Sequence, residues 1–368
     1  MARMKVFVFD PVAAGGASAR PLPQSLRRQG EMLFQSLLAD LGSLAGIEVV
    51  TAEGPGLASG AAASGGEAGS AGLYAAASAA WVQSGASSMA VSDSAAPQAQ
   101  PVPEVQRFGA HFASGLEAAD AVWPLANESG GVLEQLSRGI LRGKRILLGS
   151  APGAVEVAAS KLRLAHVLAE GGVAAVATYS PHAALPRDGG PWVVKPDDGA
   201  GCLDTRLFSG LAAALAWIRA NAADGYVLQP FVAGKLGSLS LICCDGTARM
   251  LACNQERMAM RDNRFHFLGS VVNGLVDADG ALARLAQQVA AAIPSLWGYV
   301  GVDFVLSAQG AIVLDVNPRL TAAYAGLHAS TGCNPAGMVL DLLKGPAAMT
   351  APVGMRRAVS IDIGTPWR

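Results

Sequence analysis

Short apolar runs alternate with amphipathic segments in the first part of the chain. Strand-like runs occupy 5–10, 47–51, 121–125 and 145–148, and helix-like segments occupy 29–41, 105–119 and 132–141. Within 29–41, for example, Met32, Leu33, Leu37 and Leu41 recur at the helical spacing of three and four. Repeated alternation of strand and helix predicts an open, mostly parallel α/β sheet.

The second part shows a different order of elements. Helices are predicted at 155–170, 211–222 and 281–293, and strands at 192–196, 238–244, 248–254 and 265–270. The three consecutive strands from 238 to 270 predict an antiparallel sheet. Two further apolar runs, 300–306 and 311–316, are separated by the polar turn 307–310 and predict a β-hairpin, after which a terminal helix begins near 321–325.

Oxygen-bearing side chains gather on this hairpin. In an antiparallel pair with this turn, Asp303 lies close to Asp315 across the ladder, and Asp315 and Asn317 share a face. Two neighbouring carboxylates favour a cation between them, and oxygen ligands suit Mg²⁺. The alternative is that Asp315 and Asn317 only cap the turn before Pro318.

A second candidate site is the strand 192–196, in which Lys195 leads into the glycine-containing loop 197–202. A lysine at that point places a fixed positive charge near backbone N–H groups, an arrangement that suits a phosphate. The alternative is an exposed lysine before a turn. Asn127 and Glu128 follow a predicted strand end, where open α/β sheets place ligands, although a polar loop explains them equally well.

The segments Gly-Val-Asp-Phe (301–304) and Val-Leu-Asp-Val-Asn-Pro-Arg (313–319) resemble the metal-binding end of the ATP-grasp superfamily of carboxylate–amine ligases. Asp315 stands where many members have Glu. The resemblance implies that Asp303, Asp315 and Asn317 hold Mg²⁺ or Mn²⁺ against the ATP phosphates. It also implies a catalytic role for Arg319, which would hold the transferring phosphate or the substrate carboxylate.

The nucleotide site that this resemblance implies combines lysines, a glycine-containing loop and a segment that contacts adenine. Its expected members are Lys161, Lys195, Gly199, Ala200, Gly201, Gln229, Phe231 and Val232, with Lys195 also catalytic. Asn254 and Arg257 are further candidates to face the phosphates or the acyl substrate. The chain departs from the family at Pro230, where relatives often carry Glu, and in 235–240, which contains no acid for the ribose.

The fold class we expect is α/β, an ATP-grasp fold preceded by an open parallel (pre-ATP-grasp) domain. Residues 1–152 form the N-terminal domain, 153–225 the first ATP-grasp lobe and 226–368 the second lobe with the metal hairpin. The stretch 54–100 is rich in Ala, Gly and Ser, and we expect an extended or mobile insertion there. Gly15-Gly16 is expected to be a turn and not a phosphate loop.

The expected function is an ATP-dependent ligase that joins a carboxylate to an amine through an acylphosphate and releases ADP. The opening of the chain resembles the small ligases of one-carbon (methanofuran-type) cofactor assembly, which suggests glutamate as the acid and tyramine or tyrosine as the amine. Two alternatives are a ligase for another amino acid or peptide and a non-catalytic ATP-binding protein. A dehydrogenase would need a dinucleotide fingerprint, which is absent.

Composition and charge argue against nucleic acid and membrane as partners, which leaves small-molecule substrates. The net charge is −1, from 27 basic and 28 acidic residues, and gives no footprint for nucleic acid. No long uncharged apolar run predicts a membrane span, and no signal peptide is indicated, so a cytoplasmic protein is expected. A homodimer is compatible with the sequence. The five cysteines lack zinc-site spacing and are expected to be small buried apolar residues.

Overall fold

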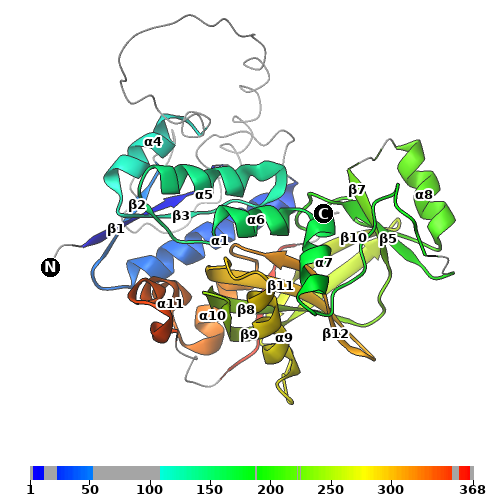
Figure 1. Ribbon diagram of the computed structural model, residues 1–368. Coiled ribbons are helices and arrows are strands. Elements are labelled where there is room, and N and C mark those ends of the chain that lie inside the picture. Colours follow the sequence, from blue (N-terminus) through cyan, green and yellow to red (C-terminus); the bar gives the residue numbers. More distant parts are fainter. Residues whose placement is uncertain are drawn as a thin grey trace, which may run out of the picture.

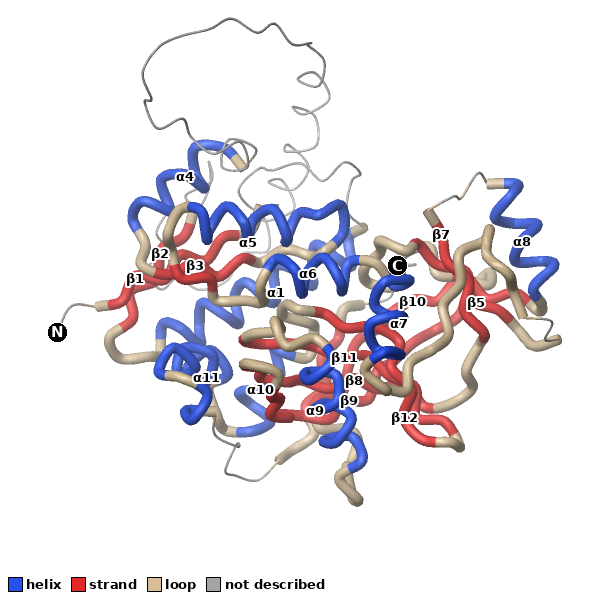
Figure 2. Tube along the Cα trace, viewed as in Figure 1, coloured by secondary structure: helices blue, strands red, loops and turns tan. Residues whose placement is uncertain are grey.

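Two β-sheets form the body of the protein in the computed structural model (Figures 1 and 2). The described residues are 3–11, 23–52, 108–186, 189–221, 223, 225–349 and 356–364. Gly15-Gly16 and the stretch 54–100 lie outside them. In these ranges, no helix is both long and apolar enough to span a membrane.

The first sheet has four parallel strands and the second has nine strands that pair mainly antiparallel. The strands are β1 (Met4–Phe9), β2 (Ile47–Thr51), β3 (Ala121–Pro124), β4 (Ile146–Leu147), β5 (Trp192–Pro196), β6 (Arg206–Phe208), β7 (Tyr226–Pro230), β8 (Lys235–Cys244), β9 (Thr247–Arg261), β10 (Arg264–Val272), β11 (Gly298–Ser307), β12 (Gly310–Asn317) and β13 (Val359–Asp362). The α-helices are α1 (Gln24–Gly42), α4 (Gly109–Ala118), α5 (Val132–Arg142), α6 (Pro152–Ala159), α7 (Lys161–Glu170), α8 (Leu211–Ala220), α9 (Ala281–Ala292), α10 (Tyr324–Thr331) and α11 (Pro335–Asp341).

The parallel sheet has the order β2-β1-β3-β4, as the alternation of elements predicts. Side chains alternate across β1, so Val6 and Val8 pack on the side of α1, α10 and α11. Phe7 and Phe9 pack on the opposite side against Phe112 of α4 and against α5. Figure 1 shows α4 and α5 on one face of this sheet and α1 on the other. The sheet is therefore covered on both faces, which explains its continuous apolar strands.

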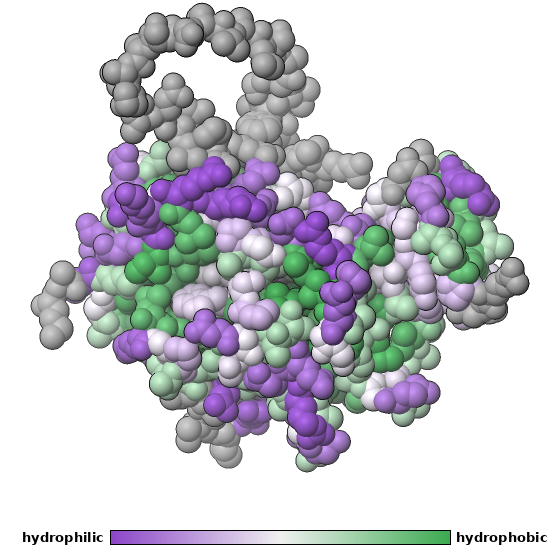
Figure 3. All heavy atoms as spheres, viewed as in Figure 1, coloured by the Kyte–Doolittle hydropathy of each residue, from purple (hydrophilic) through white to green (hydrophobic). Residues whose placement is uncertain are grey.

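Helix α5 illustrates how the sequence pattern sets the surface. Its buried residues include Leu133, Leu136 and Ile140, spaced three and four apart, whereas Arg138 and Arg142 are exposed. In Figure 3 the outward side of this helix is correspondingly hydrophilic.

The nine-stranded sheet has the order β12-β11-β8-β9-β10-β6-β5-β7, with β13 paired to β10. Helices α6, α7 and α9 supply or border the apolar cluster on one side, and α10 and α11 pack on the side that faces α1. The smaller end of the sheet, β6-β5-β7, packs against α8 and joins β10 at a single residue pair, Arg206 with Arg264. The antiparallel sheet predicted for the second part is confirmed.

Several boundaries differ from those predicted. Helix α1 begins directly after Pro23, five residues before the predicted start at Gln29. The apolar pattern did not reveal this start, because the first turn of the helix is mostly polar. The single helix predicted for 155–170 is wrong, since Ser160 adopts extended angles (φ −106°, ψ 116°) and separates α6 from α7. The Ser160 hydroxyl accepts a hydrogen bond from Arg163 N at 3.2 Å and caps α7. Helix α11 and strand β13 were not predicted.

All five cysteines are free. Cys243, Cys244 and Cys253 are buried as expected, whereas Cys202 and Cys333 are half-buried. Three of them thus serve as small apolar core residues.

Candidate functional site

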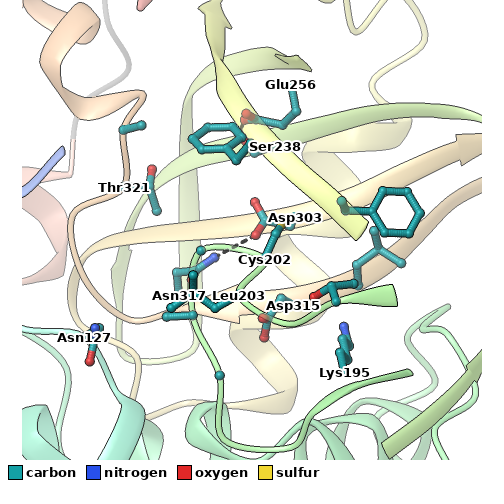
Figure 4. A pocket seen from close by; sticks show the side chains of 18 of the residues that line it. Asn127, Lys195, Cys202, Leu203, Ser238, Glu256, Asp303, Asp315, Asn317 and Thr321 are labelled. Carbon is teal, nitrogen blue, oxygen red and sulfur yellow. Dashed lines mark hydrogen bonds between the residues drawn. The ribbon is translucent and has the colours of Figure 1, made fainter. Parts of the chain in front are cut away.

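The hairpin β11–β12 brings Asp303 and Asp315 together. The two residues are direct partners in the antiparallel register, and Asn317 pairs with Gly301 two positions further along. The Asn317 amide donates a hydrogen bond to Asp303 Oδ2 at 3.0 Å. Burial and the neighbouring Asp315 raise the pKa of Asp303 to about 6. The structure therefore gathers the three predicted side chains on one hairpin, as Figure 4 shows.

The register of this hairpin shifts directly after Asp303. Phe304 pairs with Val313, so Leu314 is an extra residue on β12, a β-bulge. Val313 is buried in the core, whereas Leu314 and Asp315 both line a cavity. The bulge thus allows two consecutive side chains of β12 to face the same side of the sheet.

Both predicted lysines lie beside these carboxylates. Lys161, the first residue of α7, is only 6% exposed, and its Nζ lies 3.4 Å from Asp315 Oδ2 and donates to Gly199 O at 2.7 Å. Burial disfavours its charge, but Asp315 and Glu128 outweigh that effect and raise its pKa. Lys195 extends from β5 into the same cavity, where burial lowers its pKa to about 8.

The glycine-containing loop after β5 is fixed at both of its aspartates. Asp197 accepts hydrogen bonds from Leu162 N at 2.8 Å and from the Ser160 hydroxyl at 2.7 Å, so its carboxylate occupies the N-terminus of α7. Asp198 accepts from Gly130 N at 2.7 Å. Gly201 has φ +65°, and a Cβ there would lie 2.7 Å from the Leu26 side chain of α1. The loop therefore lies against the parallel-sheet half of the molecule.

Arg319 is paired across the two halves. Its Nε lies 2.5 Å from Glu128 Oε2 and its Nη2 lies 3.4 Å from Glu128 Oε1, while Nη2 also donates to Asn317 Oδ1 at 3.0 Å. Burial opposes the charge of Arg319, but Glu128 more than compensates and raises its pKa. Of the pair that follows β3, Glu128 holds Arg319 and Asn127 lines the cavity.

A cavity of about 430 Å³ connects these groups. From the smaller end of the large sheet it is lined by Lys195, Gly199, Ala200, Gly201, Gln229, Pro230, Phe231 and Val232. Gln229 is buried and donates to the Thr178 hydroxyl at 2.8 Å. Val176, Val193 and Leu314 add an apolar wall. Every residue expected to bind nucleotide or metal lines this one cavity.

Other cavity residues were not predicted as site residues. Asp10 follows β1, Gln29 and Gly30 belong to α1, and Thr321 follows the hairpin. Asp10 had a usable signal, because it directly follows a parallel strand at the edge where such sheets bind ligands. The α1 residues had none, since their position depends on how the helix crosses toward the large sheet.

Glu256 on β9 is the most informative residue that the sequence analysis missed. It lines the cavity, and its Oε1 accepts from the Ser238 hydroxyl at 2.5 Å and from the Ser270 hydroxyl at 3.3 Å. Its Oε2 is buried and has no hydrogen-bond partner among the described residues. Burial, with a contribution from Asp303, raises the pKa of Glu256 to about 7. Figure 4 shows Glu256 and Ser238 beyond Asp303.

Two nearby residues of β9, Asn254 and Arg257, do not face the cavity as suggested. Asn254 is fully buried and donates to the hydroxyls of Ser238 and Ser240 at 3.2 and 3.0 Å. Arg257 points to the other side of the sheet, where it binds Ile361 O at 2.9 Å and the Asp362 carboxylate. The expectation that these two residues contact phosphate or acyl substrate is wrong: Asn254 shares the face of Glu256 but is buried against the two serine hydroxyls, and Arg257 lies on the opposite face.

Protein carboxylates would supply only part of the oxygen ligands of a magnesium ion at the hairpin. In the described ranges, no group of three or more His, Cys, Asp or Glu side chains is arranged to hold a metal. Asp303 and Asp315 supply two carboxylates, and burial has raised the pKa of the first. Mg²⁺ commonly binds through one or two carboxylates with waters and substrate phosphates, so this oxygen set fits it.

Residues 158–323 match the ATP-grasp domain family, and residues 86–155 match the pre ATP-grasp 3 domain family. The fold is therefore the ATP-grasp fold preceded by a pre-ATP-grasp domain. The chain belongs to the ATP-grasp superfamily, in agreement with the resemblance carried by the hairpin. No curated protein matches the sequence.

Similar solved structures agree with this fold. An ATP-grasp superfamily protein from Archaeoglobus fulgidus is 20% identical with a TM-score of 0.64, over 98% of this chain and 92% of that one. D-alanine–D-alanine ligase from Bacillus anthracis is 13% identical with a TM-score of 0.56, over 94% and 96%. L-amino acid ligase from Bacillus licheniformis is 16% identical with a TM-score of 0.53, over 64% and 61%. At these identities the likeness concerns the fold alone.

Proposed function

We propose that the protein is an ATP-dependent ligase that joins a carboxylate to an amine. The observation that carries the proposal is the cavity in which Lys161 and Lys195 face the carboxylates of one hairpin, Asp303 and Asp315. Membership of the ATP-grasp superfamily supports it, as does the occurrence of amino-acid ligases among the proteins of similar fold.

The reaction has two steps. A carboxylate oxygen of the acid attacks the γ-phosphorus of ATP, the bond to the bridging oxygen breaks, and ADP leaves with that electron pair. The amine nitrogen then attacks the acyl carbon of the acylphosphate, loses a proton, and phosphate departs. The products are an amide, ADP and phosphate. Phosphoryl transfer of this kind depends chiefly on positioning and charge neutralisation.

The chain's own residues are proposed to supply both the positioning and the charge neutralisation. Lys195 is proposed to bind the phosphates directly, and Lys161 to add positive charge while it fixes the loop through Gly199 O. Gly199, Ala200 and Gly201 would bring backbone groups close to the phosphates. Asp303, Asp315 and Asn317 would hold Mg²⁺ or Mn²⁺, which when bound supplies the charge that neutralises the phosphate oxygens.

Arg319 is proposed to contact the transferring phosphate or the substrate carboxylate. Glu128 and Asn317 already accept from Nε and Nη2, and Leu320 O accepts from Nη1 at 3.2 Å. A guanidinium has five N–H donors, so a donor on Nη1 remains for an anion. Its pairing with Glu128 would hold the guanidinium in one orientation toward the cavity.

Adenine is proposed to lie against the strand β7 and the residues that follow it. Gln229, Phe231 and Val232 line the cavity there, and Val176, Val193 and Leu314 supply apolar surface. Pro230 has no N–H, and residues 235–240 contain no acid. The base would therefore depend on main-chain groups and apolar packing, and the ribose on few direct contacts.

For the substrates, we propose glutamate as the acid and tyramine or tyrosine as the amine, as in the tyramine–glutamate ligase of methanofuran-type cofactor synthesis. This proposal rests on the resemblance of the opening segment. A ligase for another amino acid or peptide is the alternative, and a panel of acids and amines distinguishes them. A non-catalytic ATP-binding protein is the other candidate, favoured by the missing adenine and ribose acids.

The test is analysis of the nucleotide products. The protein is incubated with ATP, Mg²⁺, glutamate and pooled amines, and hydroxylamine replaces the amine in a second reaction to trap a hydroxamate. We expect ADP and phosphate only when acid and nucleophile are both present. Stoichiometric AMP and pyrophosphate would refute the acylphosphate route. ATP binding without any turnover, whatever the pool, would instead support the non-catalytic candidate.

A further inference from the structure

Glu256 is a cavity carboxylate that the proposed roles do not use. It stands on β9, apart from the hairpin that carries Asp303 and Asp315, and only its Oε1 is satisfied, by the hydroxyls of Ser238 and Ser270. Its Oε2 is buried without a hydrogen-bond partner among the described residues. A buried carboxylate oxygen without a donor is costly, so a ligand that brings a donor gains from binding there.

Three cations near the site have carboxylate partners of their own. Lys161 pairs with Asp315, Arg319 pairs with Glu128, and Arg257 pairs with Asp362 on the other side of the sheet. In Figure 4, Lys195 and Glu256 are drawn at opposite ends of the group, with Asp303 and Asp315 between them. A positive group that pairs with Glu256 would therefore arrive with a ligand, at the end of the cavity away from Lys195.

The surface next to Glu256 is apolar. Met258 lies two residues further along β9 and so shares its face, and it pairs with Phe267 of β10. Met258, Phe265 and Phe267 all line the cavity. This end of the cavity thus combines one anionic group with thioether and aromatic surface, a combination that suits an organic ammonium with an apolar body.

We infer that Glu256 binds the ammonium group of the amine substrate and accepts a proton from it before the neutral nitrogen attacks, and that this amine carries an apolar, preferably aromatic, body. The inference rests on the proposed ligase function and adds the residue and the chemical class of the second substrate. Rotation about the last side-chain torsion of Glu is soft, so Oε2 turns toward the cavity at little cost while the serine hydroxyls follow Oε1. The resulting N–H to carboxylate hydrogen bond is charge-assisted.

The kinetic test compares wild type with Glu256→Gln, which keeps the shape and loses the charge. Tyramine serves as the charged amine, and hydroxylamine, which is mostly uncharged near neutral pH, serves as the second nucleophile. We expect KM for tyramine to rise roughly 10- to 100-fold, the effect of losing a hydrogen bond between charged groups, with KM for ATP and hydroxamate formation nearly unchanged. Glu117→Gln, at an exposed position of α4, is the matched control and should behave as wild type.

An unchanged KM for tyramine in Glu256→Gln would overturn the inference, as would equal losses with tyramine, hydroxylamine and ATP.

A binding experiment needs no turnover. Calorimetry in the presence of ADP compares 2-phenylethylamine with 2-phenylethanol, which keeps the ring and lacks the ammonium. We expect wild type to prefer the amine about tenfold or more and Glu256→Gln to lose that preference.

The two experiments separate the inference from the ligase proposal. Wild type that forms neither hydroxamate nor ADP refutes the ligase function, and the preference for the amine in calorimetry then still decides whether Glu256 recognises an ammonium. Where Glu256→Gln fails to fold, Ser270→Ala takes its place, since it removes one hydroxyl from Oε1 and leaves the carboxylate. Ser270→Ala should keep the preference for the amine. A loss of that preference in Ser270→Ala would count against direct binding by Glu256.

Discussion

Glu128 and Arg319, which are 191 residues apart in sequence, meet through two contacts at 2.5 and 3.4 Å. Glu128 lies in the loop after β3 of the parallel sheet, and Arg319 lies just after β12 of the large sheet. Glu128 is 3% exposed, so its carboxylate is largely removed from water where this ion pair joins the two halves of the molecule. Removing one partner would leave the other charge buried and uncompensated.

We therefore predict that Glu128→Ala lowers the free energy of unfolding by about 3 kcal/mol or more, as measured by urea denaturation. The control is Glu134→Ala, which breaks the more exposed pair of Glu134 with Arg138 on α5 and should cost less than about 1 kcal/mol. Equal effects of the two substitutions would show that burial of the Glu128 pair has no special importance.

Asp315→Ala should abolish turnover while the protein stays folded. Asp315 lies opposite Asp303 and pairs with Lys161, so its loss removes a proposed metal ligand and the counter-charge of Lys161. We expect a decrease in kcat of roughly a hundredfold or more, with a far-ultraviolet circular dichroism spectrum like that of wild type. Turnover close to wild type at limiting Mg²⁺ would rule out the metal assignment.

Lys195→Ala should weaken the binding of ATP by roughly 10- to 100-fold and leave adenosine almost unaffected, because the lysine is proposed to meet phosphates and not the base. Isothermal titration with both ligands measures the two effects. Lys235→Ala, a change at an exposed lysine at the start of β8, is the control. Equal losses of ATP and adenosine affinity would point to a structural role for Lys195.

The lowered pKa of Lys195 also predicts how ATP binding depends on pH. In the free protein burial lowers this pKa to about 8, and phosphates next to the amine would raise it. Below about pH 8 the lysine is charged in both states, and affinity should be flat. Above that value binding requires uptake of a proton, so affinity should fall by at most about tenfold per pH unit.

Titration of ATP into wild type and Lys195→Met at about pH 7 and about pH 9, in buffers of different ionisation enthalpy, measures that proton uptake directly. Wild type should take up a proton at the higher pH, and the variant should not. Similar proton uptake in both proteins would assign the titration to another group.

Much of the fold follows from local pattern, since strands 47–51 and 192–196 were predicted with their observed bounds. The hairpin was predictable from its short turn and two apolar runs, whereas the direct opposition of Asp303 and Asp315 also depends on the bulge at Leu314, which the sequence pattern does not reveal. The break at Ser160 was harder to predict, because apolar residues continue on both sides of it. There the side chains of Ser160 and Asp197 decide the outcome, and Asp197 lies in a loop 37 residues away.

The parts of the site that were missed depend on contacts between distant segments. Glu256 lies in a strand whose sequence shows four polar residues in a row, 254–257, and only its pairing with β8 and β10 shows which of them faces the cavity. In the same way, Arg319 was predicted as an anion-binding residue, but its pairing with Glu128 could not be foreseen from segments so far apart.

The bulge at Leu314 gives β12 one more side chain on the cavity side than a regular strand would supply. A protein that lacked Leu314 would keep Asp303 and Asp315 opposite each other in a regular ladder and would lose only this apolar part of the cavity wall. The other end of the hairpin has no such constraint, because Ala308 and Gln309 are exposed at the turn. New chain termini or a reporter peptide introduced between these two residues would leave the end that carries Asp303 and Asp315 intact, whereas a deletion of Leu314 would change the apolar wall of the cavity.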